Sequence, residues 1–231
     1  MSGAAIDADA PSRRGLAAPA LVLLSAPESN AATAYHLLHD RLSAVAATRA
    51  DSASRVLLIT GVREDDAGPA CAVNLALAAA EVNDAPVLLV EADIRRPRLA
   101  SLLALETDAT DQTAGHLCAH LEHDRGAPLP AVTVGECGLQ VAAIGPTETR
   151  PARLNLPALE ALLDRARAAG YGWILVSAAP VLGYADALLV AECADVILLA
   201  VAAGTTSVAQ VRAATQELGA ERVTGVVLID A

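Results

Sequence analysis

Short apolar runs and stretches of helical periodicity alternate along most of the chain. The apolar runs predict buried strands at 55–60, 86–90, 139–144, 173–176, 196–201 and 222–229. Helical spacing predicts helices at 30–48, 70–83, 158–168, 184–193 and 206–218, and the polar middle at 98–124 is helix-prone. Strands and helices that alternate in this way form parallel βαβ units with right-handed crossovers. The pattern therefore predicts the α/β class, with a doubly wound, mostly parallel sheet covered by helices on both faces.

The same pattern sets the expected domain boundary. Residues 1–18 are rich in Ala, Ser, Pro and Asp and have no periodicity that could build a core. We expect 1–25 to form a disordered N-terminal tail. No internal boundary interrupts the alternation after it, so we expect 26–231 to form a single α/β domain.

Composition limits how the core can be filled. Hydrophobic residues make up 54% of the chain, yet it has no Phe, one Trp and three Tyr. Ala, Val and Leu must therefore fill the core, which favours helices that approach the sheet closely. With so few aromatic side chains, the chain also lacks a platform on which nucleic-acid bases could stack.

Charge and hydropathy argue against two classes of partner. The formal net charge is −11, whereas a protein that binds nucleic acid needs a basic face. An anionic lipid surface would repel the same negative charge. No apolar run approaches the roughly 18–20 residues that span a bilayer. We expect no nucleic-acid partner and no direct membrane insertion.

The cysteines indicate a reducing compartment. Cys71, Cys118, Cys137 and Cys193 lie far apart in the sequence and form no C-x-x-C pair. Free cysteines within apolar stretches behave as small hydrophobic residues. We therefore expect a cytoplasmic protein.

The chain contains no lysine, because all 16 of its Lys and Arg residues are arginine. A phosphate-binding loop of the G-x-x-x-x-G-K-[ST] type places a lysine ammonium on the nucleotide phosphates and a hydroxyl on Mg²⁺. The segment 61–71 follows the first predicted strand, where such a loop belongs, and it carries neither group. The sequence thus indicates the scaffold of a nucleotide-binding domain without its central cation.

Three segments resemble the cytoplasmic domain of bacterial tyrosine kinases that partner polysaccharide co-polymerases. The segment 87–99 is similar to the family's apolar strand and D-x-D-x-R-R-P motif, and 171–187 is similar to its Walker B strand followed by T-P-P-V-L and S-D-A. Residues 74–76 match the N-L-A that follows the family's phosphate loop. These kinases belong to the deviant-Walker P-loop group, together with the ParA/MinD ATPases. The resemblance implies that 26–231 is a P-loop NTPase-like domain.

The resemblance also implies where a nucleotide would bind, and there the chain departs from the family. Gly68 stands at the lysine position, Pro69 and Ala70 at the hydroxyl positions, Glu91 at the first aspartate, Ser177 at the Walker B aspartate and Ile229 at a base-contacting asparagine, while Asp93 is kept. These substitutions imply a degenerate pocket, for which we expect no catalytic residue and no bound cofactor. ATP and Mg²⁺ are expected only if the family's activity survives on an unusual loop.

Two further family features are altered. The helical oligomerisation motif of these kinases maps to Thr33, His36 and His39, and no tyrosine-rich segment follows the last predicted strand. The resemblance therefore does not decide whether the chain forms a homo-oligomer. The two histidines, expected on an exposed helix face, could make contacts of that helix sensitive to pH.

Acidic residues lie in the loop itself. Glu64, Asp65 and Asp66 come just ahead of a helix whose first turn includes Pro69. Pro69 removes one backbone N–H from the phosphate site. The carboxylates favour the positive helix end, and they would repel a nucleotide by roughly 1–4 kcal/mol per close pair. We hypothesise that the loop is filled by its own acids, and the alternative is a solvated acidic turn.

Charged residues after two other strands have a structural and a functional interpretation. Arg95, Arg96 and Arg98 could form a small anion or partner site, or could fix the loop that follows the second strand. Asp93 and Asp186 could be remnants of a metal site. Without the rest of that site, we interpret both as caps or hydrogen-bond acceptors.

One group of residues has the spacing of a metal site. His116, His120 and His123 share a helical face at i, i+4 and i+7, and Cys118 lies between them on another face. No second ligand cluster accompanies them. We expect a solvated or partner-facing helix and no metal, with the three histidines as weak candidate ligands.

The resemblance implies a function that does not require catalysis. We expect a non-catalytic accessory partner of an inner-membrane polysaccharide co-polymerase (a chain-length-determinant protein), recruited by it to the cytoplasmic face of the inner membrane. Its role would be in exopolysaccharide biosynthesis and export, for a capsule, slime or adhesin. Two alternatives stay open: an active tyrosine autokinase or weak ATPase of the same family, and a ParA/MinD-like positioning factor.

Overall fold

One seven-stranded sheet organises the structure. A computed structural model of the chain describes residues 20–49, 54–64, 66–105, 117–123, 128–146, 148–151 and 153–230. The strands are β1 (Arg55–Gly61), β2 (Val87–Glu91), β3 (Val132–Val134), β4 (Leu139–Ala142), β5 (Trp173–Ser177), β6 (Val196–Ala202) and β7 (Val223–Ile229). Their order is β3-β4-β2-β5-β1-β6-β7, and all neighbouring pairs are parallel except β3–β4. The predicted doubly wound, mostly parallel sheet is confirmed.

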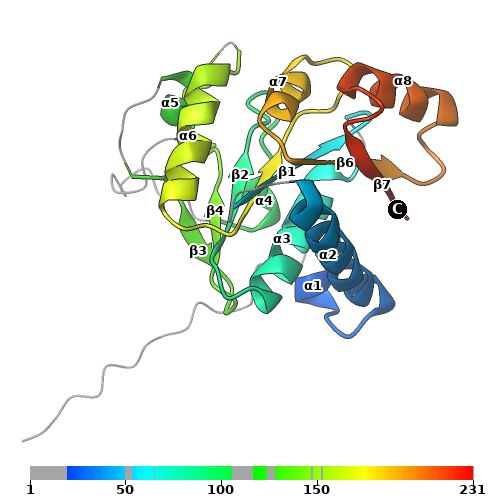
Figure 1. Cartoon of the computed structure of the whole chain (residues 1–231), viewed down its shortest axis with the longest axis horizontal. Helices are drawn as coiled ribbons and strands as arrows, with labels where there is room; N and C mark the ends of the chain where they lie inside the picture. The colour runs from blue at the N-terminus through cyan, green and yellow to red at the C-terminus, as the bar shows by residue number, and fades with distance from the viewer. Residues whose placement is uncertain are drawn as a thin grey trace, which may run out of the picture.

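Helices cover both faces of this sheet (Figure 1). The described helices are α1 (Val22–Ser25), α2 (Asn30–Arg49), α3 (Gly68–Val82), α4 (Leu99–Leu102), α5 (Leu117–Glu122), α6 (Leu156–Ala168), α7 (Asp186–Glu192) and α8 (Val208–Leu218). Helices α1 to α4 pack on one face, and α5 to α8 pack on the other. None of the described helices combines the length and hydropathy needed to span a bilayer.

Helix α3 shows how the core is built without phenylalanine. Every residue from Ala70 to Ala79 is buried, because the sheet lies on one side of the helix and α1 and α2 lie on the other. Small side chains on all its faces let α3 approach both layers closely, so that Leu and Val from the sheet fill the remaining space. The expectation of an Ala, Val and Leu core with close helices is met here.

The start of the described chain corrects the expected tail. Residues 20–25, which we had placed in a disordered tail ending at 25, include α1, and Leu21 and Leu23 are buried. Asn74 on α3 holds this segment, since its Oδ1 accepts the Leu23 N–H at 3.2 Å and its Nδ2 donates to the Ala20 carbonyl at 2.8 Å. Asn74, the first residue of the N-L-A motif, therefore joins the segment 20–23 to helix α3.

Two predictions about the central region were incomplete. The edge strand β3 was not predicted, since it has only three residues and two of them are exposed. The strand expected over 139–144 ends at Ala142. Its continuation is lost because the Ile144 N–H donates to the carboxylate of Glu91 at 3.0 Å instead of a neighbouring strand.

A histidine expected on an exposed face is buried. His39 on α2 is 4% exposed, and its ring lies edge-on to Trp173 of β5 with centroids 5.5 Å apart. Its Nε2 lies 3.0 Å from Asn83 Nδ2 and 3.3 Å from Ser43 Oγ. Burial lowers the pKa of His39 from its ordinary value of 6.5, and the nearby carboxylate of Asp40 opposes this effect only in part.

The burial of His39 predicts that acid loosens α2. The unfolded chain takes up a proton at the ordinary pKa and the folded chain only at a lower one, so His39 costs stability as pH falls below about 6.5. We expect His39→Gln to unfold less steeply with acid than the natural chain between neutral pH and about pH 5. Urea unfolding followed by circular dichroism at a series of pH values measures this. His36→Gln, on the same helix but more exposed, is the control, and equal slopes for all three proteins would contradict the prediction.

Candidate functional site

A hollow of about 390 Å³ lies where the phosphate site of a nucleotide-binding domain is expected. It opens at the carboxyl ends of β1, β2 and β5, beside the first turn of α3. In open α/β sheets this edge is where ligands bind. Its lining includes Arg63, Glu64 and Asp66 from the β1–α3 loop and Asp93, Arg96 and Arg98 from the segment after β2. Of the predicted pocket positions, Pro69, Ala70 and Asp93 line this cavity, whereas Gly68, Glu91 and Ser177 are not part of its wall.

The carboxylate of Asp66 closes the loop between β1 and α3. Its Oδ2 accepts the Arg63 N–H at 2.7 Å, while its Oδ1 accepts the Ala202 N–H at 2.8 Å and the Thr206 hydroxyl at 2.7 Å. Asp66 is only 6% exposed. The loop is therefore anchored to the end of β6 through an anion that belongs to the chain. Asp66 therefore occupies the loop, as we hypothesised for its acidic residues. Asp65 lies outside the described residues.

Two glycines make this closed loop possible. A Cβ on Gly61 would lie 2.9 Å from the Cβ of Asp66, closer than side chains pack. A Cβ on Gly68 would lie 3.1 Å from the Gly61 nitrogen. The loop therefore folds tightly on the end of β1. Even a Cβ would be crowded at Gly68, the residue that the resemblance places at the family's lysine position.

Glu64 forms the rim of the hollow with residues from two other loops. Its Oε2 lies 2.5 Å from Arg96 Nη1, and its Oε1 accepts the Tyr184 hydroxyl at 2.5 Å. The guanidinium of Arg95 lies 5.2 Å from the centre of the Tyr184 ring, and its Nε donates to Asp186 at 3.0 Å. Two arginines that could have faced a phosphate are therefore paired with carboxylates of the chain.

The first turn of α3 offers little to an anion. The helix begins at Gly68 with Pro69 in its first turn, and no side chain caps it. Proline has no N–H to donate, so one of the donors of a phosphate-binding helix start is absent. Neither Gly68, Pro69 nor Ala70 supplies a charge or a hydroxyl.

Glu91 acts as a brace between three segments. One carboxylate oxygen accepts the N–H groups of Arg98 at 2.5 Å and Leu99 at 2.9 Å, and the other accepts the Ile144 N–H. Glu91 is 1% exposed. Burial raises its pKa to about 7, although the three N–H donors act in the opposite direction. Its carboxylate is thus directed at backbone and is not presented to the hollow.

The remaining carboxylates of the site also have structural partners. Asp93 Oδ1 accepts the backbone N–H groups of Arg95 at 3.1 Å and Arg96 at 2.9 Å, which makes it the cap of the loop after β2. Asp186 pairs with Arg95. Ser177 ends β5 opposite Glu91 in register. In the described part of the chain, no three His, Cys, Asp or Glu side chains are grouped as a metal site requires.

The histidines singled out from the sequence are not presented together. His116 lies outside the described residues. On α5, His120 is buried at 2% exposure with its Nδ1 3.2 Å from Arg165 Nη2, whereas His123 has a side chain that is 67% exposed. The expected solvated helix is therefore wrong for His120, because this side of α5 packs against α6.

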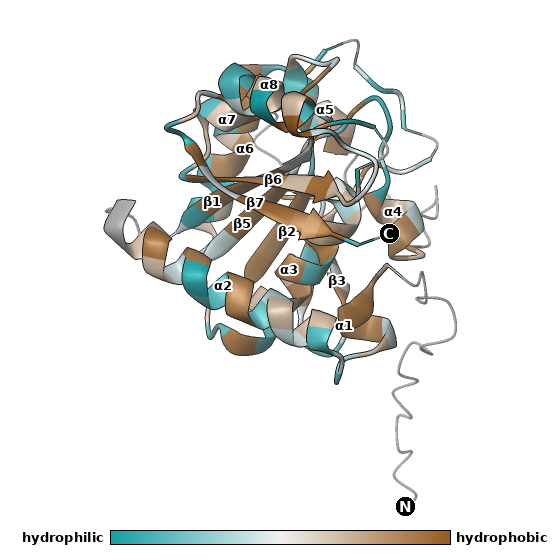
Figure 2. Ribbon diagram, turned by 90° about the vertical axis from the view of Figure 1, so that its right-hand side faces the viewer, coloured by the Kyte–Doolittle hydropathy of each residue, from teal (hydrophilic) through white to brown (hydrophobic). Residues whose placement is uncertain are grey.

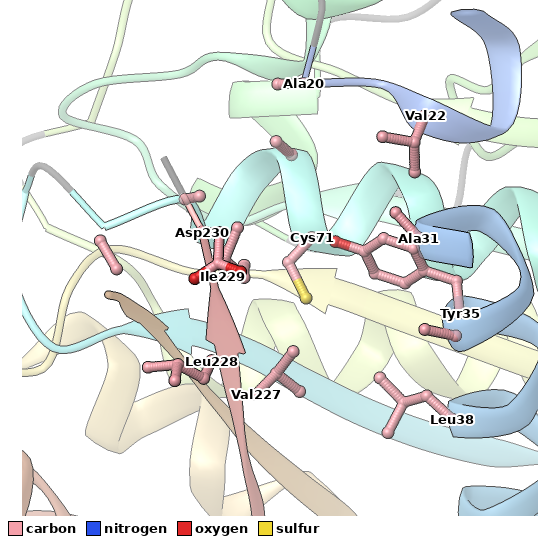
Figure 3. A pocket seen from close by; sticks show the side chains of 14 residues that line it. Ala20, Val22, Ala31, Tyr35, Leu38, Cys71, Val227, Leu228, Ile229 and Asp230 are labelled. Carbon is pink, nitrogen blue, oxygen red and sulfur yellow. The ribbon is translucent and has the colours of Figure 1, made fainter. Parts of the chain in front are cut away.

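A second hollow was not foreseen from the sequence. It has a volume of about 590 Å³ and lies between α2, the start of α3 and the end of β7 (Figure 3). Its wall is mainly apolar, and Ile229, at the expected base-contacting position, is part of it. Tyr35 reaches across from α2 toward Cys71 on α3. Burial raises the pKa of Cys71 to about 12, so the thiol stays protonated near neutral pH and is a poor nucleophile.

The two hollows meet at the start of α3. Ala20, Ala67 and Ala70 line both of them. Charged side chains line much of the first hollow, and mainly apolar side chains line the second. The second hollow was missed because its wall combines residues from both ends of the chain, which no local pattern connects.

Comparison with known proteins supports the fold more than any detail of the site. No protein-family model matches the chain. No curated protein matches it in sequence either. Similarity is found among solved structures, at low sequence identity.

Several of those structures are bacterial tyrosine kinase domains. The kinase domain of Escherichia coli tyrosine kinase ETK has a TM-score of 0.70 and 21% identity, over 91% of this chain and 80% of that domain. The chimerical protein CapA2B2 has a TM-score of 0.72 and 20% identity, over 92% and 89%. A ParA family ATPase from Chlorobium tepidum has a TM-score of 0.56 and 18% identity, over 77% and 73%. The chain therefore has the fold shared by these kinase domains and the ParA/MinD ATPases.

The contacts of Asp66 predict that the loop depends on its carboxylate. Asp66→Ala leaves the Arg63 and Ala202 N–H groups and the Thr206 hydroxyl without this acceptor, and we expect a loss of about 1–3 kcal/mol in the free energy of unfolding. Urea unfolding measures the loss. Glu64→Ala is the control, because its more exposed contacts contribute less than about 1 kcal/mol. Equal losses for the two variants would show that Asp66 is not the anchor.

The raised pKa of Glu91 predicts a dependence of stability on pH. The folded chain holds a proton on Glu91 up to about pH 7 and the unfolded chain only up to its ordinary value of 4.5. Glu91 therefore lowers the free energy of unfolding as pH rises between these values, by up to about 3 kcal/mol. Glu91→Gln cannot titrate, so the free energy of unfolding of the natural chain, taken relative to that of this variant, is expected to fall by up to about 3 kcal/mol as pH rises from 4.5 to 7. A difference that stays constant over this range, measured by urea unfolding, would contradict the assignment.

Proposed function

We propose that the protein is a non-catalytic, cytoplasmic accessory partner of an inner-membrane polysaccharide co-polymerase. It acts in exopolysaccharide biosynthesis and export, for a capsule, slime or adhesin. Its partner, a chain-length-determinant protein, recruits it to the inner-membrane face. No ATP or Mg²⁺ is part of this role.

The fold supports a kinase-type origin for this role. The TM-scores with the ETK and CapA2B2 structures, 0.70 and 0.72, exceed the 0.56 with the ParA family ATPase. The match with the two kinase structures also covers more of the chain, 91% and 92% against 77%. The segment after β2 keeps R-R-P and the segment after β5 keeps P-V-L. These features favour the polysaccharide group over a ParA/MinD-like positioning factor.

One observation carries the non-catalytic part of the proposal. The loop that would hold a triphosphate is closed on Asp66, which is bound to backbone N–H groups and to Thr206. Glu64 adds a second carboxylate to the rim. A triphosphate placed here would meet two fixed anions and no lysine. Two negative charges at this range repel by roughly 1–4 kcal/mol per pair, which works against any nucleotide contact that the site retains.

The proposed mechanism follows from a loop whose hydrogen-bond donors are already taken by the carboxylate of Asp66. A protein that does not turn over nucleotide acts through its surface, so we place its activity in docking to the cytoplasmic ends of the co-polymerase helices. The hydrogen bonds of Asp66 and the brace at Glu91 keep the loops beside α3 in one conformation. Docking is then constitutive and is not switched by ATP.

A specific feature favours the alternative of an active kinase or weak ATPase. Arg63, Arg96 and Arg98 line the hollow, and guanidinium groups bind phosphates well. If Arg96 left Glu64, it would face a bound anion. This alternative requires binding that depends on Mg²⁺ and transfer of the γ-phosphate to tyrosine.

Two measurements on the full chain test the proposal. Isothermal calorimetry with ATP and ADP, with and without Mg²⁺, is expected to show no Mg²⁺-dependent binding, while an active tyrosine kinase domain binds under the same conditions. Incubation with radiolabelled ATP is expected to leave the chain unlabelled. Mg²⁺-dependent binding together with labelled tyrosine would overturn the non-catalytic role and establish the alternative.

A third measurement tests the partner. The tagged chain is expected to retain a detergent-solubilised co-polymerase encoded beside it, to the same extent with and without ATP. Absence of retention would contradict the accessory role. Retention only in the presence of ATP would instead indicate a nucleotide-switched protein of the ParA/MinD type.

A further inference from the structure

Tyr184 differs from the other two tyrosines of the chain in its surroundings. Tyr35 and Tyr171 pack against the clusters of buried side chains on the two faces of the sheet, and Tyr184 belongs to neither cluster. It lies in the turn between β5 and α7, and Gly183 and Ala185 on either side of it are exposed. A Cβ at Gly183 would meet nothing within 4 Å. The turn therefore presents Tyr184 at the surface of the molecule.

The hydroxyl of Tyr184 connects the two helical layers. It donates to Glu64, which precedes α3, whereas Tyr184 itself precedes α7. Figure 2 shows α3 on one side of the sheet and α7 with α6 and α8 on the other. The strands before the two loops, β1 and β5, are neighbours in the sheet, so both loops leave at the same edge. A change at the Tyr184 hydroxyl therefore alters how two loops from opposite layers meet.

Two guanidinium groups flank this hydroxyl. Arg96 Nη1 lies 2.5 Å from the Glu64 carboxylate that accepts the hydroxyl, and the guanidinium carbon of Arg95 lies 5.2 Å from the centre of the Tyr184 ring. The side chains of Arg96 and Arg95 are 62% and 43% exposed. The hydrogen bond to Glu64 raises the pKa of Tyr184, and the two guanidinium groups oppose this effect only in part. The hydroxyl is thus held beside two cations, and it shares a carboxylate with Arg96.

The carboxylate of Glu64 occupies the place that a phosphate on Tyr184 would take. One of its oxygens binds the hydroxyl and the other binds Arg96, so the group bridges the two side chains. A phosphate ester on the same hydroxyl makes that bridge covalently at one end. It carries a charge of about −1.5 to −2 near neutral pH, and guanidinium groups bind it with paired N–H donors. It therefore displaces the singly charged Glu64 from Arg96 and repels it.

We propose that Tyr184 is a phosphorylation site and that Arg96 receives its phosphate in place of Glu64. The phosphoryl donor is ATP bound to a separate protein-tyrosine kinase. A bond forms between the Tyr184 oxygen and the γ-phosphorus, and the bond from that phosphorus to the β,γ-bridging oxygen breaks. ADP leaves, and the hydroxyl proton passes to a base of the kinase. Arg95, beside the ring, adds a second positive charge near the new phosphate.

A covalent phosphate suits this place better than a free anion. A free phosphate in the hollow meets the carboxylates of Glu64 and Asp66, and nothing holds it while it competes for Arg96. An ester bond keeps the phosphate beside Arg96 at a high effective concentration, so that it displaces Glu64 without having to bind from solution. The contacts therefore favour a modification of Tyr184 over a site for a dissolved anion.

Phosphorylation changes the rim of the hollow and leaves the anchor of the loop intact. Asp66 keeps its hydrogen bonds to Ala202 and Thr206, because neither involves Tyr184. Glu64 loses its contacts with Tyr184 and Arg96, so the β1–α3 loop is no longer joined to the turn before α7 at this point. The modified form thus presents a different charge and a different rim at the carboxyl edge of the sheet.

Phosphopeptide mass spectrometry tests the modification. The full chain is isolated from the cells that make it, and a second sample is treated with ATP and the ETK kinase domain. Phosphate is expected on the peptide that contains Tyr184. Tyr184→Phe is expected to lose nearly all of it, whereas Tyr35→Phe and Tyr171→Phe, the matched controls at the other two tyrosines, keep it. Absence of phosphate from both samples, or phosphate on tyrosine that Tyr184→Phe leaves unchanged, would overturn the proposal.

Incubation with ATP alone separates this inference from the proposed function. The inference does not rest on that function, because the donor ATP is bound by another protein. If the chain labels itself, the non-catalytic role fails, and the position of the label still decides whether Tyr184 is the modified residue.

The receiving site is tested on a chain that carries phosphotyrosine at position 184, introduced during translation. Phosphorus NMR follows the second ionisation of the phosphate, which has an ordinary pKa of about 6. Arg95 and Arg96 lower this pKa, while Glu64 and Asp186, which face the same groups, oppose them. With Glu64 displaced, we expect a pKa lower than the ordinary value by about half a unit.

Two arginine variants show whether Arg96 is the partner of the phosphate. Arg96→Gln is expected to return the phosphate pKa to its ordinary value. Arg212→Gln, at an exposed position on α8, is the matched control and is expected to leave the lowered pKa unchanged. Circular dichroism establishes that each protein is folded. A phosphate pKa that is not lowered in the natural background, or that does not respond to Arg96→Gln, would refute the receiving site.

Discussion

A buried carboxylate within the β1–α3 loop is the contact on which the character of the site depends. Asp66 accepts hydrogen bonds from its own loop and from the end of β6, so it joins two segments that are 136 residues apart in the sequence. A phosphate-binding loop at the start of a helix leaves its backbone N–H donors for the anion. Here the loop carries its own anion, and the glycines at 61 and 68 let it lie directly on the end of β1. The rest of the pocket is arranged around a loop that is already closed.

The surrounding charges follow the same principle of internal pairing. Glu64 binds Arg96, Asp186 binds Arg95, and Asp93 caps the backbone between them. Each of these three carboxylates thus has a structural partner within the chain. Arg95 and Arg96 stay partly in solvent, so each of these ion pairs contributes at most about 1 kcal/mol to stability. These contacts connect the loops after β1, β2 and β5.

The sequence was sufficient to predict the sheet and most of its strands, but it could not predict which side chains contact one another. Apolar runs such as 196–201 are local signals, and they located every described strand except β3 to within one or two residues. Asp66 could be named as one of three acidic candidates, but its partners Ala202 and Thr206 lie far along the chain and no spacing rule points to them. His39 was misjudged because its burial depends on Trp173, and α1 was missed because Asn74 stabilises it from another helix. Each error concerns a residue whose environment is set by tertiary contact.

The position of β1 at the centre of the sheet has a consequence for how the molecule acquires its structure. Its two neighbours, β5 and β6, begin more than a hundred residues later in the sequence. During synthesis, the first strand to leave the ribosome therefore waits for the last third of the chain before either of its edges is covered. Folds dominated by such distant pairings form slowly, and their early strands are exposed to aggregation while they wait. We therefore expect β1 to need protection by chaperones until β5 and β6 have been made.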